Sequence, residues 1–144
     1  MTIELMAAKA QDLEQLNQIY LQLNESGSDP ARMKSAFDSI RQNPDYYLLV
    51  AKREDQIVGT LMGIVCHVLA DNCKPFLVVE NVVVREDCRR QGIAQKMFQR
   101  IEEWAKEKGC GYSLLVSGGA RTWAHQFYEK VGYNDFVRGF RKIY

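Results

Sequence analysis

The segment spanning residues 76–116 constrains the fold more than any other part of this sequence. It opens with an uninterrupted β-prone run at residues 76–84 and passes through a polar turn at residues 85–88. A helix with a periodic apolar face follows, and a second short apolar run covers residues 112–116. A strand, a helix and a strand in this order form a right-handed crossover between parallel strands. The sequence therefore predicts at least one parallel pair in the sheet.

The remaining patterns complete an α/β fold of the α+β type. Its sheet is expected to be mixed but mostly antiparallel, because short turns join the three middle strands, and about four helices flank it. Asp12, with Gln15 as its capping-box partner, predicts the start of the first helix. Asp29 before Pro30 predicts the start of the second. The expected strands cover residues 2–7, 46–52, 57–69, 76–84, 112–116 and 136–144, and the other two helices begin near residues 93 and 122.

Length and composition restrict the class of protein. A chain of 144 residues predicts one domain, residues 1–144. The net charge of +1 argues against general binding to nucleic acid or to an anionic membrane. No apolar segment approaches the roughly 20 residues that span a bilayer, and the first residues do not resemble a signal peptide. Four cysteines without CxxC spacing favour free thiols in the cytoplasm and predict no metal site.

The start of the third helix predicts a local anion site. Arg89, Arg90, Gln91, Gly92, Ile93 and Ala94 lead from a strand into that helix. The first backbone N–H groups of a helix lack partners within it, and the helix dipole adds positive charge there. Glycine, which has no Cβ, permits close approach of the backbone to a phosphate. Neither a Walker A loop nor a GxGxxG dinucleotide motif is present, so the spacing excludes those two phosphate sites.

At this point the sequence resembles the GCN5-related N-acetyltransferases, the GNAT family. Arg89-x-x-Gly92-x-Ala94 is similar to the family's Q/R-x-x-G-x-G/A motif, and residues 127–133, FYEKVGY, are similar to its FYEKxGF segment. The inferred order of elements matches over nearly the whole chain. Glu80-Asn81-Val82-Val83-Val84 is also similar, more weakly, to the Glu-Asp-Val-Val-Val of glucosamine-phosphate N-acetyltransferases, with Asn81 in place of aspartate.

The resemblance implies a GNAT fold and acetyl-CoA as the acyl donor. The turn would bind the CoA pyrophosphate, and the strand before it would pair through its backbone with the pantetheine arm. Many relatives carry an asparagine seven residues before the tyrosine of FYEKxGF, where this chain has Arg121, so Ser117 or Arg121 is the candidate for that contact. The implied cofactor-binding residues are Val82, Val83, Val84, Arg89, Arg90, Gln91, Gly92, Ile93, Ala94, Gln95, Ser117 and Arg121.

The resemblance further implies direct acetyl transfer to a primary amine. Tyr128 is the candidate acid, because a phenol is protonated at neutral pH and can donate to a departing thiolate. Glu80 is the candidate base, on the argument that an apolar cleft raises a carboxyl pKa toward neutrality. The alternatives are a core tyrosine for Tyr128 and a strand-rim residue that orients substrate for Glu80. His67 and His125 are weaker candidate bases.

The sequence leaves the nature of the acceptor open. A small-molecule amine is expected, with a protein or peptide acetyltransferase and a non-catalytic CoA-binding module as alternatives. The acceptor site is expected beside the first two helices, the turn near residues 70–75 and the last strand, which carry Glu25, Asp29, Asp71 and Arg138. An unpaired last strand would also allow a homodimer.

Overall fold

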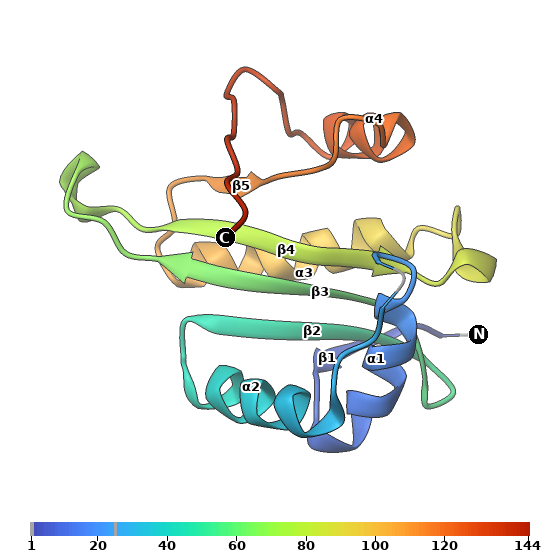
Figure 1. Cartoon of the computed structure of the whole chain (residues 1–144). Coiled ribbons are helices and arrows are strands. Elements are labelled where there is room, and N and C mark those ends of the chain that lie inside the picture. The colour runs from blue at the N-terminus through green and yellow to red at the C-terminus, as the bar shows by residue number, and fades with distance from the viewer. Residues whose placement is uncertain (1, 25) are drawn as a thin grey trace. The chain divides into compact units, whose positions relative to one another are not determined.

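The computed structural model describes residues 2–24 and 26–144, which contain four α-helices and five β-strands (Figure 1). The chain divides into two compact units, Met1–Leu114 and Leu115–Tyr144. No helix in the described residues has both the length and the apolar character to cross a membrane. The helices are α1 (Leu13–Tyr20), α2 (Pro30–Gln42), α3 (Ile93–Glu107) and α4 (Thr122–Lys130), and the strands are β1 (Glu4–Ala7), β2 (Tyr46–Arg53), β3 (Gln56–Cys66), β4 (Phe76–Val84) and β5 (Ser113–Leu115).

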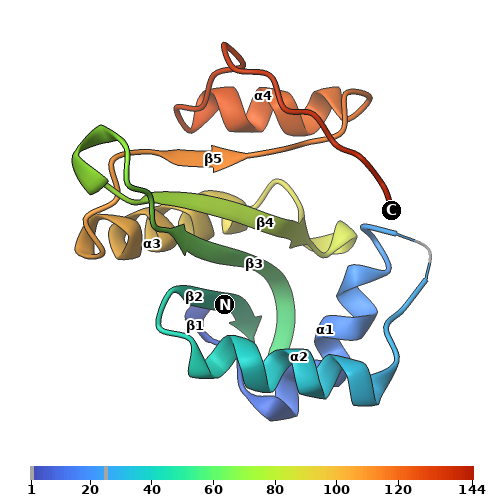
Figure 2. The same ribbon diagram turned by 60° about the vertical axis from the view of Figure 1, so that its left-hand side comes forward.

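The sheet has the strand order β1-β2-β3-β4-β5. The first four strands pair antiparallel in sequence order. At the far edge, the Gly111 N–H donates to the Pro75 carbonyl over 2.9 Å, and the Leu77 N–H donates to the Tyr112 carbonyl over 3.0 Å. Residue numbers increase along both segments in the same direction, so β4 and β5 are parallel (Figure 2). The predicted mixed sheet with one parallel pair is confirmed.

Glycines let α3 lie close against β3. A Cβ placed on Gly59 would lie 3.1 Å from the Met97 methyl group, and one on Gly63 would lie 2.6 Å from Ile101 Cδ1. Met97 and Ile101 are fully buried, so the sheet and the helix pack at a distance that a larger residue would not allow. The opposite face of the sheet packs against α1, where Leu16 and Ile19 join Val50 and Val83 in one apolar cluster.

A β-bulge interrupts β4. Met62 pairs with Glu80 and Thr60 pairs with Val83, so two residues of β4 lie opposite Leu61 alone. Asn81 adopts a positive φ of 54° at this point, a conformation that asparagine tolerates better than most residues. A second irregularity lies where β3 pairs with β2: Ala51 pairs with Gly59 and Lys52 with Ile57, which leaves Val58 of β3 as an extra residue beside Gly59.

Two of the helix starts can be compared with their predicted caps. The Asp29 side chain accepts a hydrogen bond from the Arg32 N–H over 3.0 Å, and Pro30 is the first residue of α2, which confirms that cap. The predicted Asp12–Gln15 capping box is wrong. The Gln15 amide instead accepts from the Ile57 N–H over 2.8 Å.

The Asp12 side chain makes no cap hydrogen bond to α1. It is buried and forms an ion pair with Lys52 of β2, with Lys52 Nζ 2.6 Å from its Oδ1. Its other oxygen accepts from the Lys9 N–H over 2.8 Å. The ammonium and the backbone donor together satisfy the buried carboxylate.

In the second unit, α4 has the bounds that the sequence predicts, but the described residues 136–144 do not form the expected strand. The Phe136 N–H donates to the Asn134 side chain over 3.2 Å, a local bond that competes with strand pairing. Phe136 and Phe140 are 90% and 91% exposed, so their side chains gain little from burial. The homodimer stays a prediction, and the described residues 136–144 do not supply the strand through which it was expected.

Candidate functional site

The turn before α3 has the backbone of an anion site. Arg90 and Gly92 both have positive φ, 62° and 79°, and they flank Gln91 on the approach to the helix. Residues that alternate between right- and left-handed conformations can direct successive N–H groups toward one point. Gly92 is the N-cap of α3 and supplies no side-chain cap to its first N–H groups. Those donors are the ones that an anion can satisfy.

The space beside Gly92 is open. Among the described residues, no atom lies within 4 Å of where its Cβ would be. The preference for glycine therefore comes from its left-handed backbone and not from crowding by the chain. Arg90, Gln91 and Gln95 are exposed around it, whereas Ile93 is buried and anchors the helix start to the core.

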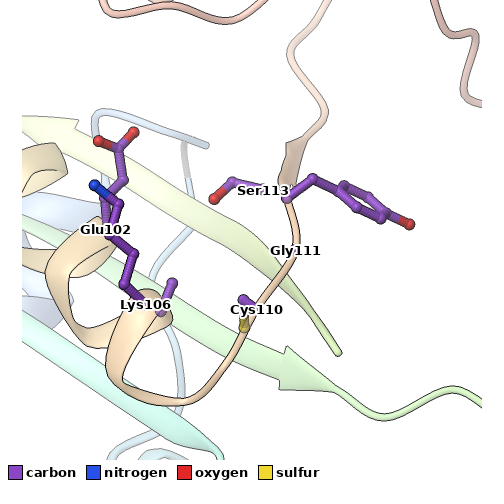
Figure 3. Close-up of a pocket in the computed structure, with 7 residues that line it drawn as sticks. Glu102, Lys106, Cys110, Gly111 and Ser113 are labelled. Atoms are coloured by element: carbon purple, nitrogen blue, oxygen red, sulfur yellow. The ribbon is translucent and has the colours of Figure 1, made fainter. Parts of the chain in front are cut away.

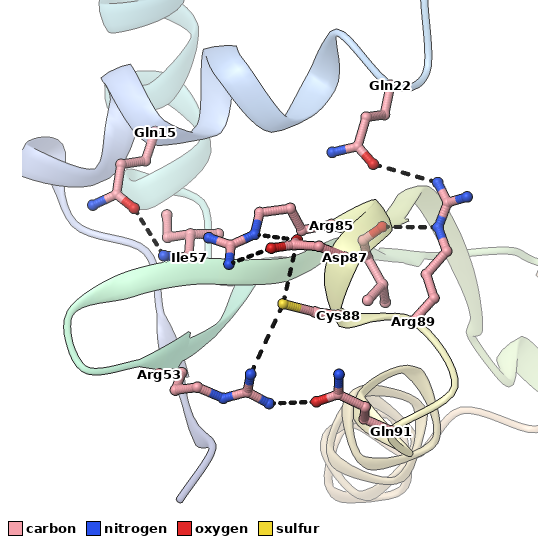
Figure 4. Close-up of polar contacts among 10 residues, drawn as sticks. Gln15, Gln22, Arg53, Ile57, Arg85, Asp87, Cys88, Arg89 and Gln91 are labelled. Carbon is pink, nitrogen blue, oxygen red and sulfur yellow. Dashed lines mark hydrogen bonds and ion pairs between the residues drawn. The ribbon is translucent and has the colours of Figure 1, made fainter. Parts of the chain in front are cut away.

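Two side chains and one backbone carbonyl from other segments hold this turn (Figure 4). Arg89 Nη2 donates to Gln22 Oε1 after α1 over 3.3 Å, and its Nε donates to the Val84 carbonyl at the end of β4 over 3.2 Å. Arg53, the last residue of β2, donates through Nη2 to Gln91 Oε1 over 2.7 Å. The sequence did not indicate either partner, because Gln22 and Arg53 are far from the motif along the chain.

A second set of contacts fixes the segment that leads into the turn. The Arg85 guanidinium forms two bonds with Asp87, at 2.6 and 3.1 Å. This pair, chiefly through its hydrogen bonds, lowers the pKa of the exposed Asp87 carboxyl. The buried Cys88 thiol donates to Asp87 Oδ1 over 3.5 Å. Residues 85–88, which directly precede the turn, are thus held together by their own side-chain hydrogen bonds.

Glu80 lies beside the bulge in β4. Its side chain is exposed and is directed to the face opposite α3, because its partner Met62 lies on that face. The exposure of Glu80 differs from the apolar cleft that the sequence argument assumed around it. Val82 and Val84 are half-buried and Val83 is buried against α1.

The other candidate residues belong to the second unit and are described within it. Tyr128 lies on α4, its ring 6.3 Å from that of Tyr133. Burial raises the pKa of the Tyr128 phenol, an effect that the charge of Arg121 partly opposes, so the phenol stays protonated at neutral pH. The Arg121 guanidinium lies 4.9 Å from the Trp123 ring centroid. The Ser117 hydroxyl oxygen is buried and has no hydrogen-bond partner among the described residues.

Both candidate histidines have partners. His67 Nε2 lies 3.0 Å from Asp45 Oδ2 at the end of β3, and the side chain is exposed. His125 Nε2 lies 2.8 Å from the Gly118 carbonyl and joins α4 to the turn before it. These contacts give each histidine a structural role.

The structure describes three of the four residues predicted for an acceptor site. Glu25 lies outside the described residues. Asp29 caps α2, and Asp71 belongs to a tight turn in which Asp71, Asn72 and Cys73 all have positive φ. Arg138 lies in the exposed C-terminal segment. No group of three or more His, Cys, Asp or Glu side chains suited to a metal ion occurs in residues 2–24 and 26–144.

A surface pocket of the first unit lies between the end of α3 and the start of β5 (Figure 3). Burial raises the pKa of the Glu102 carboxyl, and the charge of Lys106 partly opposes this increase. Burial also raises the pKa of the Cys110 thiol, and a protonated thiol is a poor nucleophile. None of the predicted site residues lines this pocket.

Comparison with known proteins identifies the class to which this fold and turn belong. The model of the acetyltransferase (GNAT) family matches residues 12–133. The chain therefore belongs to the GNAT family, and this membership identifies it as an acyltransferase of the N-acetyltransferase class.

Two curated relatives carry the same class name. The uncharacterized N-acetyltransferase YhdJ of Bacillus subtilis is 30% identical over 97 residues, which span 67% of this chain and 68% of that protein. An aminoglycoside N(6′)-acetyltransferase type 1 of Acinetobacter genomosp. 13 is 24% identical over 112 residues, which span 76% of this chain and 77% of that protein.

Solved structures share the fold over nearly the whole chain. A putative acetyltransferase from Agrobacterium tumefaciens has a TM-score of 0.91 at 26% identity, covering 98% of this chain and 99% of that one. Glucosamine-6-phosphate N-acetyltransferase from Arabidopsis thaliana has a TM-score of 0.90 at 21% identity, covering 100% and 99%. The aminoglycoside acetyltransferase AAC(6′)-Iy, in complex with a CoA bisubstrate analogue, has a TM-score of 0.85 at 17% identity, covering 100% and 99%.

Proposed function

We propose that this protein transfers an acetyl group from acetyl-CoA directly to a primary amine of a small molecule, and that residues 1–144 act as one catalytic domain. The observation that carries the donor assignment is the turn before α3, where Arg90 and Gly92 have positive φ and the helix start lacks a side-chain cap. A pyrophosphate supplies the negative charge that such a turn accepts.

The donor would contact the chain along its length. The pyrophosphate would be bound by the turn, Arg89–Gln95, and the pantetheine arm would pair with the backbone of Val82–Val84 in the manner of an added strand. The Ser117 hydroxyl, buried with no partner in the described part of the chain, is suited to a hydrogen bond with a ligand amide. Arg121 supplies a cation for a CoA phosphate.

The reaction requires two proton movements. A free alkyl amine has a pKa near ~10, so it must lose a proton before it can attack. In our proposal Glu80 takes this proton, directly or through water. The neutral nitrogen then bonds to the acetyl carbon while the carbon–sulfur bond breaks and the electron pair leaves on sulfur. Tyr128 donates its proton to that thiolate, and its burial keeps the phenol protonated until then.

Support for a small-molecule acceptor comes from the relatives. The Acinetobacter protein and AAC(6′)-Iy are named as aminoglycoside acetyltransferases, and an aminoglycoside is a polar molecule that carries several primary amines. The acceptor of this chain is proposed only to the level of that class, a polar small molecule with a primary amine.

The proposal is tested by thiol release with acetyl-CoA across a panel of aminoglycosides, amino sugars, polyamines, amino acids and peptides, together with calorimetric titration of acetyl-CoA. We expect binding of acetyl-CoA and turnover with at least one small amine. Turnover confined to peptides would move the function to a peptide acetyltransferase. Binding without any turnover would favour a CoA-binding module, and absence of binding at millimolar ligand would refute the proposal.

A further inference from the structure

The strongest unassigned feature of the first unit is Arg53, at the tip of the β2–β3 hairpin. Glu54 and Asp55 both have positive φ, 49° and 65°, as in the tight two-residue turns that join antiparallel strands. Arg53 pairs with Gln56 across this turn. The pairing of Ala51 with Gly59 places Ala51 on the α3 side of the sheet, and Arg53, two residues further along β2, has its side chain on that same side.

Arg53 contacts the turn from two directions. Its Nη2 donates to Gln91 Oε1 over 2.7 Å, a short bond to the centre of the motif. Its Nη1 lies 3.9 Å from the buried Cys88 Sγ, just before the motif (Figure 4). Gln91 lies between the two residues of positive φ, Arg90 and Gly92. A bond to Gln91 therefore restrains the part of the turn whose backbone conformation is least favourable for ordinary residues.

The charge of Arg53 is not neutralised within the described residues. No carboxylate pairs with it there, and its Nε is buried without a hydrogen-bond partner. A partly buried cation without a counter-charge is costly to the folded protein. An anion bound at the adjacent turn would offset this cost by attraction between opposite charges.

We infer that Arg53 is a positioning residue for the pyrophosphate of the donor: it holds Gln91 and so the turn in its binding conformation, and its charge favours an anion there. The inference rests on the proposed function, since it concerns the donor that the turn binds. Arg53 itself is not proposed to touch the reacting atoms.

The test compares two donors that share the thioester and the pantetheine arm and differ in the pyrophosphate. Dissociation constants for acetyl-CoA and for S-acetyl-pantetheine are measured by calorimetry on the whole protein and on Arg53→Met. We expect Arg53→Met to weaken acetyl-CoA binding about tenfold, the loss of one charge-assisted bond, and to leave S-acetyl-pantetheine binding within about twofold. A purely structural role would weaken both donors alike, and that result would overturn the inference.

Further variants keep the test decisive if Arg53→Met folds poorly. Gln91→Ala removes the other end of the bond without altering the hairpin, and the double variant should be no weaker than Arg53→Met alone. Arg53→Lys should keep part of the affinity because it keeps the charge. Arg41→Met, which removes the Arg41–Asp38 ion pair of α2 (3.3 Å), is the matched control and should bind both donors normally.

Three outcomes separate the two claims. If the unaltered protein does not bind acetyl-CoA, the proposed function fails and the inference with it. If it binds acetyl-CoA and Gln91→Ala and Arg53→Met add independently, the turn binds the donor but Arg53 does not position it. If the loss is specific to acetyl-CoA and shared by the two variants, the inference is confirmed.

Discussion

Gly63 and Ile101 meet where α3 crosses β3, and a Cβ placed on Gly63 would lie 2.6 Å from Ile101 Cδ1 and 2.8 Å from its Cγ1. Ile101 is fully buried, so its side chain has little room to move away. Gly63→Ala should therefore lower the free energy of unfolding by about 1–3 kcal/mol through overpacking, as measured by urea denaturation. Gly119→Ala, where no atom of the described residues lies within 4 Å, is the control and should change stability by less than about 0.5 kcal/mol.

Gly92 and Gly109 lie at opposite ends of α3 and allow a matched comparison. Both have a φ of 79°, and in the described part of the chain no atom lies within 4 Å of where a Cβ on either would be. Alanine at either site should cost a similar backbone strain of about 1–2 kcal/mol. Only Gly92→Ala should weaken acetyl-CoA binding, because only there would the methyl group face the pyrophosphate. Equal acetyl-CoA affinity of the two variants would remove the turn from the donor site.

Tyr128→Phe should lower kcat about a hundredfold, the usual worth of a positioned proton donor, and change the KM for acetyl-CoA by less than about twofold. Tyr144→Phe, at an exposed tyrosine, should leave both constants unchanged. A matching loss in kcat and in donor affinity would instead make Tyr128 a binding residue. Steady-state kinetics across acetyl-CoA concentrations distinguish the two results.

The pH dependence follows from the direction of the Tyr128 pKa. Burial raises it above the ordinary value of a phenol, and the acid acts only while protonated. Its contribution to rate is therefore complete at neutral pH and is lost as pH rises through the raised pKa. The pH–rate profile of the unaltered enzyme should decline only in the alkaline range, through a pKa above that of an ordinary phenol, and the Phe variant should lack this alkaline decline.

Asp12→Asn should be among the most destabilising single substitutions in the chain. It leaves the buried Lys52 ammonium without its counter-charge, while asparagine can still accept the Lys9 N–H, so the ion pair alone is tested. We expect a loss of about 3–5 kcal/mol in the free energy of unfolding. Asp38→Asn, at an exposed pair on α2, should cost less than about 1 kcal/mol. A loss of similar size in both variants would contradict the special role of burial.

Local signals in the sequence predicted the helices well. Asp29 with Pro30, and Gly109 after the last basic residues of α3, mark helix ends through chemistry that acts within one turn of chain. The crossover from β4 through α3 to β5 also followed from residue order alone. The motif at residues 89–94 was identified for the same reason, because its donors are adjacent in sequence.

The parts that sequence did not predict depend on contacts over long distances. Asp12 is a residue type that often caps helices, yet its ion-pair partner Lys52 is 40 residues away. The strand predicted at residues 136–144 needs a neighbouring strand to pair with, and the residues of that segment alone cannot show whether one is present. Arg53 carries no local mark of its contact with Gln91, since only the fold of the hairpin brings the two together.

The bulge at Asn81 has a consequence for how this strand can change in length. After the bulge, Val83 pairs with Thr60 and Val84 with Gly59. Before the bulge, the last pair is Glu80 with Met62. Leu61 needs only one residue opposite it, and β4 supplies two. A chain lacking Asn81 could close the β3–β4 ladder with its other pairings unchanged. β4 thus carries one residue more than its register with β3 requires, so a deletion of this single residue is compatible with that ladder.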